Sequence, residues 1–212
     1  MAQKRLWTHL LIVAAIAAML LATATADAAF PGRNGRIAFV RGVGPTFGPM
    51  IFTMKPNGSD VRKLTHDSNG KGTFGPVFSP DGTRIVYAEP SWHGYRGFGL
   101  FHMRTDGTFQ RRFSIGNNPD YSPYGGHIVS DGRGTHGNDD ISKVEPNGAH
   151  YISLTLTPSV PDEYPAFSPN SRWIVWSQEG ELFKMRSNGN RIRRLTRPAL
   201  GDYLPDWQPR AR

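Results

Sequence analysis

The stretch that decides the fold is Ile51-Phe52-Thr53-Met54-Lys55-Pro56-Asn57-Gly58, followed after a short gap by Leu64-Thr65. It is the first of four copies of one phrase, and the other copies are centred on Gly107, Gly148 and Gly189. In every copy a Ser or Thr lies seven positions after the Gly. Self-similarity at a period of about 40–50 residues is the signature of a repeat architecture.

A second phrase precedes the first one in the later repeats. Its fullest copy is Phe78-Ser79-Pro80-Asp81-Gly82, and Tyr121, Phe167 and Trp207 occupy the aromatic position in the other copies. Because every repeat needs the same packing, we expect these aromatic residues to form core between repeats, not a stacking platform for a ligand. The two phrases place the repeats at about residues 30–73, 74–116, 117–160 and 161–200.

Each repeat has the composition of a small antiparallel sheet. The Pro-Asp-Gly turn after Phe78 leads into Arg84–Ala88, which is β-branched and aromatic like a strand. Asp106-Gly107 and its equivalents are strong hairpin-turn dipeptides. We therefore predict an all-β chain whose four four-stranded repeats are the blades of a β-propeller.

These motifs give the chain a resemblance to a known family. It resembles the TolB-like (WD-type) β-propeller repeats, through Phe78–Gly82, Phe167–Asn170 and the four Gly-centred segments. The resemblance covers residues 29–212 and implies an exported propeller that works as an interaction scaffold. TolB itself resembles an α/β domain followed by six blades, whereas four repeats are present in this sequence.

The end of the sequence repeats only the opening of a blade. Pro205-Asp206-Trp207-Gln208-Pro209 has no second phrase after it, and little sequence precedes the strand expected from Arg36. We predict that residues 201–209 supply the first strand of that sheet and close a four-bladed ring in a monomer. An open arc of four blades and two chains joined at their edges are the alternatives.

Residues 1–28 have the form of a secretory signal peptide. Lys4 and Arg5 precede an apolar run from Leu10 to Ala22, and Ala26-Asp27-Ala28 follows. This run is shorter than the roughly 20 residues that cross a bilayer, so we expect no membrane span. The prediction is a periplasmic or secreted protein, held together without disulfides because the chain contains 0 cysteines.

The net charge of +8 is carried partly by basic pairs at one repeat position, which are Arg62-Lys63, Arg111-Arg112 and Arg193-Arg194. Such pairs could attract nucleic acid or other acidic partners. They also protect exposed strand edges from pairing with other chains. An exported protein meets little nucleic acid, so we favour edge protection and expect no nucleic-acid partner.

The segment from Ser130 to Asp140 is rich in Asp and Gly. Its oxygens could bind Ca²⁺, but the spacing fits neither the EF-hand loop nor the nonapeptide calcium repeat. The segment also falls where an ordinary connection between two strands is expected. We favour a plain turn and predict no metal or other cofactor.

The loop from Pro90 to Gly99 is the feature that the other repeats do not share. Residues that break a repeat are the usual carriers of specificity in such folds. We predict a recognition surface made from this loop and the Asp-rich turn, with these members: Trp92, His93, Tyr95, Phe98, His136 and Asp139. Self-packing of the loop is the alternative.

No catalytic motif is present in the sequence, which lacks a G-x-S-x-G elbow, an H-E-x-x-H pair and a cysteine nucleophile. We therefore expect an exported, non-catalytic propeller that binds a protein, a peptide or an envelope glycan. The alternative is a small propeller hydrolase, of lactonase or glycosidase type, with a metal or acidic site in its channel.

Overall fold

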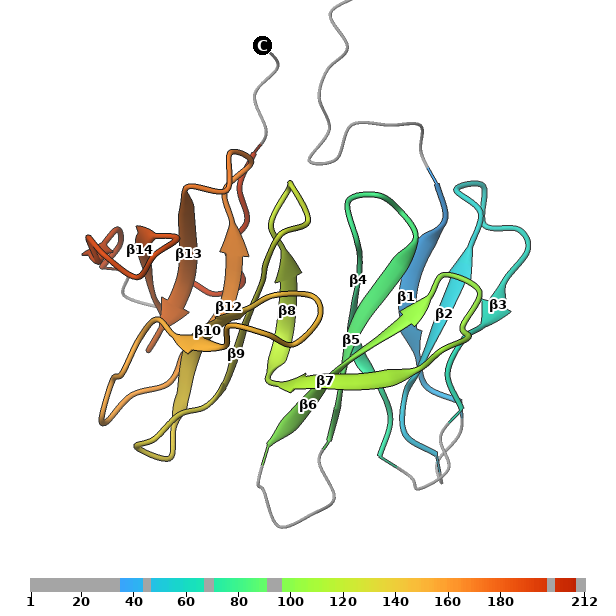
Figure 1. Cartoon of the computed structure of the whole chain (residues 1–212), viewed down its shortest axis with the longest axis horizontal. Helices are drawn as coiled ribbons and strands as arrows, with labels where there is room; N and C mark the ends of the chain where they lie inside the picture. The colour runs from blue at the N-terminus through green and yellow to red at the C-terminus, as the bar shows by residue number, and fades with distance from the viewer. Residues whose placement is uncertain (1–34, 44–46, 67–70, 91–96, 198–200, 209–212) are drawn as a thin grey trace, which may run out of the picture. The chain divides into compact units, whose positions relative to one another are not determined.

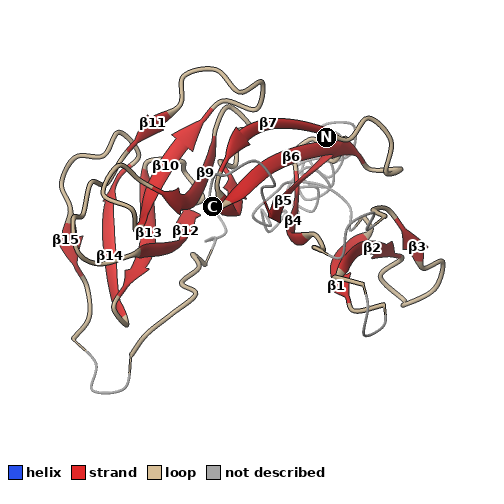
Figure 2. Ribbon diagram, turned by 90° about the horizontal axis from the view of Figure 1, so that it is seen from below, coloured by secondary structure: helices blue, strands red, loops and turns tan. Residues whose placement is uncertain are grey.

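The computed structural model describes residues 35–43, 47–66, 71–90, 97–197 and 201–208. All of them belong to one structural unit, Gly32–Gln208. Figure 2 shows strands and loops in this part of the chain, and no described segment forms a helix that is long and apolar enough to cross a membrane.

The strands form four antiparallel sheets that follow one another along the chain (Figure 1). Blade 1 contains β1 (Ile37–Arg41), β2 (Met50–Met54) and β3 (Arg62–Lys63). Blade 2 contains β4 (Phe74–Phe78), β5 (Arg84–Pro90), β6 (Phe98–Arg104) and β7 (Arg111–Ile115). Blade 3 contains β8 (Asn117–Tyr121), β9 (Ile128–Arg133), β10 (Asp139–Val144) and β11 (Ile152–Ser153). Blade 4 contains β12 (Asp162–Phe167), β13 (Trp173–Gln178), β14 (Glu181–Arg186) and β15 (Arg193–Arg194).

The predicted all-β, four-bladed β-propeller fold is therefore confirmed. Blades 2, 3 and 4 each have four strands, and blade 1 has three among the described residues. The missing member is the first strand of the blade, because β1 corresponds to β5, β9 and β13 in the order of each sheet.

A buried serine holds the turn between the first two strands of blades 2, 3 and 4. In blade 4 the Ser168 hydroxyl accepts the Trp173 N–H at 3.0 Å and donates to Asn170 at 2.8 Å. Ser79 and Ser122 accept the equivalent backbone N–H groups, also at 3.0 Å. The buried serine of the repeated phrase thus accepts a hydrogen bond from a partly buried backbone N–H in each of these blades.

Apolar side chains lie between blades, not within one central core. Alternate residues of β5 point to opposite faces of the sheet. Ile85 and Tyr87 pack with Ile51 and Leu64 of blade 1. Val86 and Ala88 belong to a second cluster, shared with blade 3, whose other buried members are Leu100, Tyr121, Ile128 and Val144.

The boundary between blades 3 and 4 has a cluster of the same kind. Val129 and Ile141 of blade 3 pack there with Phe167, Ile174 and Trp176 of blade 4. The repeated aromatic residues Tyr121 and Phe167 are buried, as expected for core. Packing between neighbours therefore requires these residue types at every blade.

The C-terminal residues 201–208 have one property of a first blade strand. Leu204 has a φ of +55°, and Gly75, Asn118 and Tyr164 share this left-handed conformation at the equivalent position of β4, β8 and β12. The Trp207 indole N–H donates to the Ala166 carbonyl of β12 at 3.3 Å. Residues 201–208 form no strand, however, and β1 pairs only with β2 among the described residues, so ring closure stays a prediction.

The serine network gives a test of the blade turns. Ser168→Ala should lower the free energy of unfolding by about 0.5–1.5 kcal/mol, because the partly buried Trp173 N–H loses its acceptor. Ser159→Ala is the matched control, since Ser159 is exposed and should change the stability little. Urea denaturation of both variants measures the difference, and equal stabilities would contradict the role of the serine.

Candidate functional site

The predicted recognition surface is only partly described by the structure. Trp92, His93 and Tyr95 lie outside the described residues. Phe98 is half-buried at the start of β6 and packs edge-to-face on Phe74, with their ring centroids 5.9 Å apart. Its binding role stays a prediction, and its visible contact is one of packing.

His136 and Asp139 belong to the β9–β10 hairpin in blade 3. His136 is exposed in the connection, whereas Asp139 is half-buried in the first position of β10. This hairpin lies at the lower end of blade 3 in Figure 1. The structure therefore brings His136 and Asp139 into one hairpin, and Phe98 lies in the neighbouring blade.

The Asp-rich segment forms the plain turn that the sequence favoured. The Gly134 N–H donates to the Asn138 carbonyl at 2.8 Å and closes the hairpin. The Asn138 amide donates to the carbonyls of Thr157 and Val160 at 2.7 and 2.6 Å, which ties the turn to the chain before β12. Within the described residues, no group of three or more acidic or histidine side chains is arranged to hold a metal ion.

Two carboxyl groups near this hairpin join blade 3 to blade 4. Burial raises the pKa of Asp131 to about 7, and the Asp131 carboxyl accepts hydrogen bonds from Asn118 and from the Tyr164 N–H, both at 2.8 Å. Burial also raises the pKa of Asp120 to about 7, and this group accepts the Phe167 N–H at 2.7 Å. Both groups thus hold the backbone of β12 in place.

Asp162 is fully buried and is also held by its neighbours. It accepts hydrogen bonds from the Trp176 indole at 2.8 Å, the Gln178 amide at 2.7 Å and the Thr157 hydroxyl at 2.8 Å. A general acid or base needs a free position facing a substrate. These contacts indicate a structural role for Asp162.

A different region combines exposed charge with a cavity. Arg84, Arg104 and Arg111 line a cavity of about 430 Å³ together with His102 and Phe109. Arg84 is paired with Arg104 across β5 and β6, and His102 with Arg111 across β6 and β7. Directly paired residues share a face of a sheet, so these cationic side chains lie on one face of blade 2.

His102 lies among the arginines on this face of blade 2. Its pKa is lowered first by burial and then by the positive charges of Arg84 and Arg111. The ring stacks on Phe113, with the ring centroids 5.3 Å apart. His102 is therefore neutral at pH 7, and the charge of the cavity comes from its three arginines.

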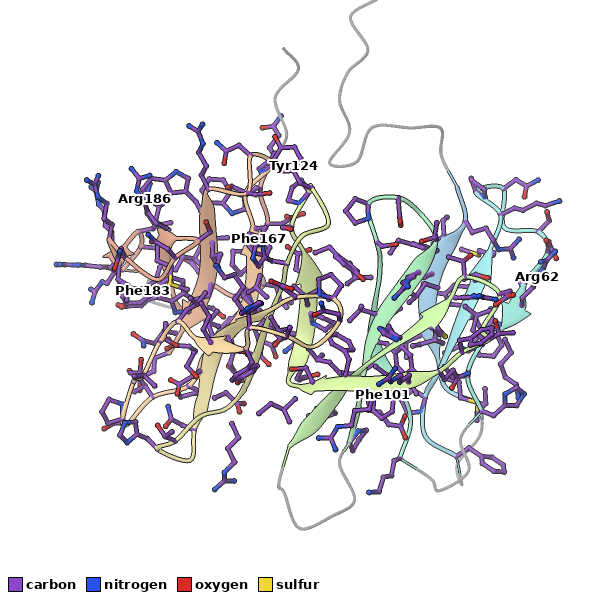
Figure 3. The ribbon with its side chains drawn as sticks, in the orientation of Figure 1. Arg62, Phe101, Tyr124, Phe167, Phe183 and Arg186 are labelled. Atoms are coloured by element: carbon purple, nitrogen blue, oxygen red, sulfur yellow. The ribbon has the colours of Figure 1, made fainter. Side chains whose placement is uncertain are left out.

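Arg84 also lines a neighbouring cavity between blades 2 and 3. That cavity measures about 670 Å³, and its remaining walls are Ser79, Pro80, Asp81, Tyr121, Pro123, Tyr124, Gly125, Pro146 and Asn147. Tyr124 is 75% exposed, and Figure 3 shows it at the turn between β8 and β9. We call the two cavities that share Arg84 the basic groove.

The acidic residues nearest to the basic groove are engaged in their own turns. The Asp81 carboxylate accepts hydrogen bonds from the hydroxyls of Ser79 and Thr83, at 2.5 and 2.9 Å. The Asp106 carboxylate accepts the Thr108 hydroxyl at 2.7 Å. Within the part of the chain that the structure describes, no ion pair within 4.0 Å joins a carboxylate to Arg84, Arg104 or Arg111.

The sequence analysis did not single out this groove, although the repeats carry a signal for it. Tyr124 occupies the turn position that holds Asp81 in blade 2 and Asn170 in blade 4. Phe109 lies two residues after the turn Gly, where blade 1 has Asp60. Tyr124 and Phe109 thus differ from the residues at the same positions of other repeats, and both lie in short turns that line the basic groove. The predicted recognition surface rests on such differences in the long loop.

No family model and no curated protein matches this chain. Its structure is similar to a protein described as a TolB from Agrobacterium tumefaciens, at 20% identity and a TM-score of 0.59, over 69% of this chain and 56% of the other. TolB from Acinetobacter baumannii is similar at 21% identity and a TM-score of 0.59, over 73% of this chain and 38% of the other. Oligogalacturonate lyase in complex with manganese is similar at 13% identity and a TM-score of 0.53, over 70% and 42%.

This chain thus spans less than two thirds of the length of these similar proteins. At such identities, the likeness shows a β-propeller fold of the TolB type and not an activity.

The buried carboxyl groups give a prediction about pH. The pKa of Asp131 is higher in the folded chain than its ordinary value of 3.8, so the folded state binds more protons between pH 3.8 and about 7. The protonated Asp131 carboxyl therefore contributes to the free energy of unfolding. This contribution is complete below the ordinary pKa of 3.8 and is lost as the pH rises through about 7.

Asp131→Asn keeps an oxygen for the two donors and removes the charge. We expect its melting temperature at pH 8 to exceed that of the unmodified protein by a few °C, since 1 kcal/mol corresponds to about 2–4 °C at this size. Asp106→Asn is the control with the opposite sign, because hydrogen bonds to Thr108 lower the pKa of Asp106. Melting curves at pH values from 4 to 8 test both variants. If the melting temperature of Asp131→Asn depends on pH as steeply as that of the unmodified protein, the raised pKa is wrongly assigned to Asp131.

Proposed function

We propose that this chain is an exported, non-catalytic β-propeller that binds a protein, a peptide or an envelope glycan through the basic groove. The observation that carries the proposal is the exposed Tyr124 beside Arg84, at a cavity built by two blades. Tyrosine and arginine are the residue types most enriched at the energetic centres of binding sites.

The groove has features that packing does not require. Pro80, Pro123 and Pro146 line it with rigid apolar surface, and Asn147 adds a polar group. Tyr124 replaces the turn residue that would receive a hydrogen bond from the neighbouring serine, as Asp81 and Asn170 do. An exposed aromatic residue at that position brings no gain in turn stability, which supports a binding role.

Export is proposed from the form of residues 1–28, which carry basic residues, an apolar run and an Ala-x-Ala site. The resemblance to TolB-like repeats agrees with this location. A non-catalytic role is proposed because Asp120, Asp131 and Asp162 are engaged in hydrogen bonds that join the strands of blades 3 and 4.

Capture of partners from an envelope extract tests the proposal. The immobilised full chain should enrich a partner that Tyr124→Ser captures about tenfold less, because the central aromatic contact is lost. Tyr203→Ser is the matched control, since Tyr203 is also exposed but lies outside the groove.

Equal capture by both variants would contradict the groove as the binding face. Turnover of a lactone or glycoside that depends on Asp131 or Asp139 would favour the hydrolase alternative.

A further inference from the structure

We propose that Arg84, Arg104 and Arg111 form a binding site for one anionic group, a carboxylate or a phosphate, carried by the partner. The proposal rests on the proposed function only in taking the basic groove as the binding face; the site itself is argued from blade 2. The anionic group is the part of the partner that the basic groove would recognise.

The first argument is the concentration of like charge. Arg84 and Arg104 are directly opposite each other on β5 and β6, an arrangement that is unfavourable without a counter-charge. Arg111 lies on the same face through its pairing with His102. All three arginines line one cavity, so a bound anion would relieve their repulsion.

The second argument is the comparison with blade 1. Arg36 and Arg62 occupy the positions of Arg84 and Arg111, and Asp60 forms ion pairs with both at 2.8 Å. These hydrogen bonds hold the pKa of Asp60 at about 2. Blade 1 therefore offsets part of the charge of its two arginines with one carboxylate from within the repeat.

Phe109 takes the place of Asp60 in blade 2, with the same backbone conformation. The φ angles are +54° at Asp60 and +55° at Phe109, and His150 and Arg191 have +53° and +61° at the equivalent positions. The side chains therefore start from matching points in their blades. Blade 2 alone has a phenylalanine there, so its arginines lack the ion-pairing carboxylate that Asp60 supplies in blade 1. Asp81 and Asp106 lie near Arg84 and Arg104, and hydrogen bonds first and then these positive charges lower the pKa of each carboxyl, but neither forms an ion pair within 4.0 Å among the described residues.

Phe109 also orients one of the arginines. The Arg104 guanidinium lies over the Phe109 ring, 3.9 Å from its centroid. Stacking occupies the face of the guanidinium and leaves its N–H groups at the edge, where they can donate to an anion. Arginine matches the planar, bidentate geometry of carboxylate and phosphate groups.

The other blades do not reproduce this site. In blade 3, Glu145 takes the place of Arg104 and pairs with His150 at 2.7 Å. In blade 4, Trp173 takes the place of Arg84, and Lys184 and Arg186 lie over its ring at 5.1 and 5.0 Å. Arg186, which is labelled in Figure 3, therefore serves as a matched control for Arg104.

Calorimetric titration of the full chain with inorganic phosphate, and separately with glutarate, tests the proposal at low ionic strength. We expect one anion per chain, bound more weakly as salt is added. A phosphate-only or a glutarate-only response identifies which anionic group the site prefers, and either supports it.

Phe109→Asp should weaken binding at least about tenfold, because it supplies the carboxylate that blade 1 already has. Arg111→Gln should act in the same direction and covers the case in which Phe109→Asp does not fold. Arg186→Gln should bind as the unmodified chain does.

Binding of neither anion would overturn the site. Binding by Phe109→Asp and Arg111→Gln as tight as that of the unmodified chain would also overturn it, as would a loss in Arg186→Gln as large as theirs. These outcomes are separate from those of partner capture. Anion binding that Phe109→Asp abolishes, with capture insensitive to Tyr124→Ser, supports the site and refutes the docking face. Capture that depends on Tyr124 without any anion binding supports the docking face and refutes the site.

Discussion

The whole structure depends on the packing of one blade against the next. In blades 2 and 3 the second strand, β5 or β9, is buried on both faces, so its side chains alternate between the preceding and the following blade. In β5, Tyr87 packs toward blade 1 while Val86 packs toward blade 3. A sheet of three or four short strands is marginal when isolated, so these shared clusters stabilise the fold.

This constraint determines where specificity can lie. A position that faces a neighbouring blade must keep its size and apolar character in every repeat, as Tyr121 and Phe167 do. Turn residues at the blade ends are free of that demand. Tyr124 and Phe109 are both turn residues, and both replace a polar residue type found at the same position of another blade.

The repeated phrase was sufficient to predict the blades, because it contains the turns, the strand composition and the core aromatics together. The basic groove could not be predicted in the same way. It depends on the register that places Arg84 opposite Arg104, and on the contact between blades that places Tyr124 beside Arg84. Neither the register nor the blade contact is visible in the linear order of the residues.

The predicted recognition residues illustrate the same limit. The long loop was selected because it breaks the repeat, and Phe98 within it is tied to blade packing through Phe74. Residues of a long loop that differ from the other repeats can pack against their own blade and need not contact a partner. Phe109 differs in this respect, because its φ angle of +55° is shared with the equivalent residues of the other three repeats, so its side chain leaves the backbone from the same point of the blade.

The charge at these turns shows how a repeat protein can create a site with very few substitutions. Blades 1 and 2 share the same two arginine positions, and they differ in whether the left-handed residue after the turn is Asp60 or Phe109. With Asp60 the arginines are satisfied within the blade. With Phe109 the same charges face outward, next to an aromatic surface. Because the scaffold is retained, exchanging one side chain at this position separates a blade whose two arginines share one internal carboxylate from a blade whose arginines form no ion pair within 4.0 Å among the described residues.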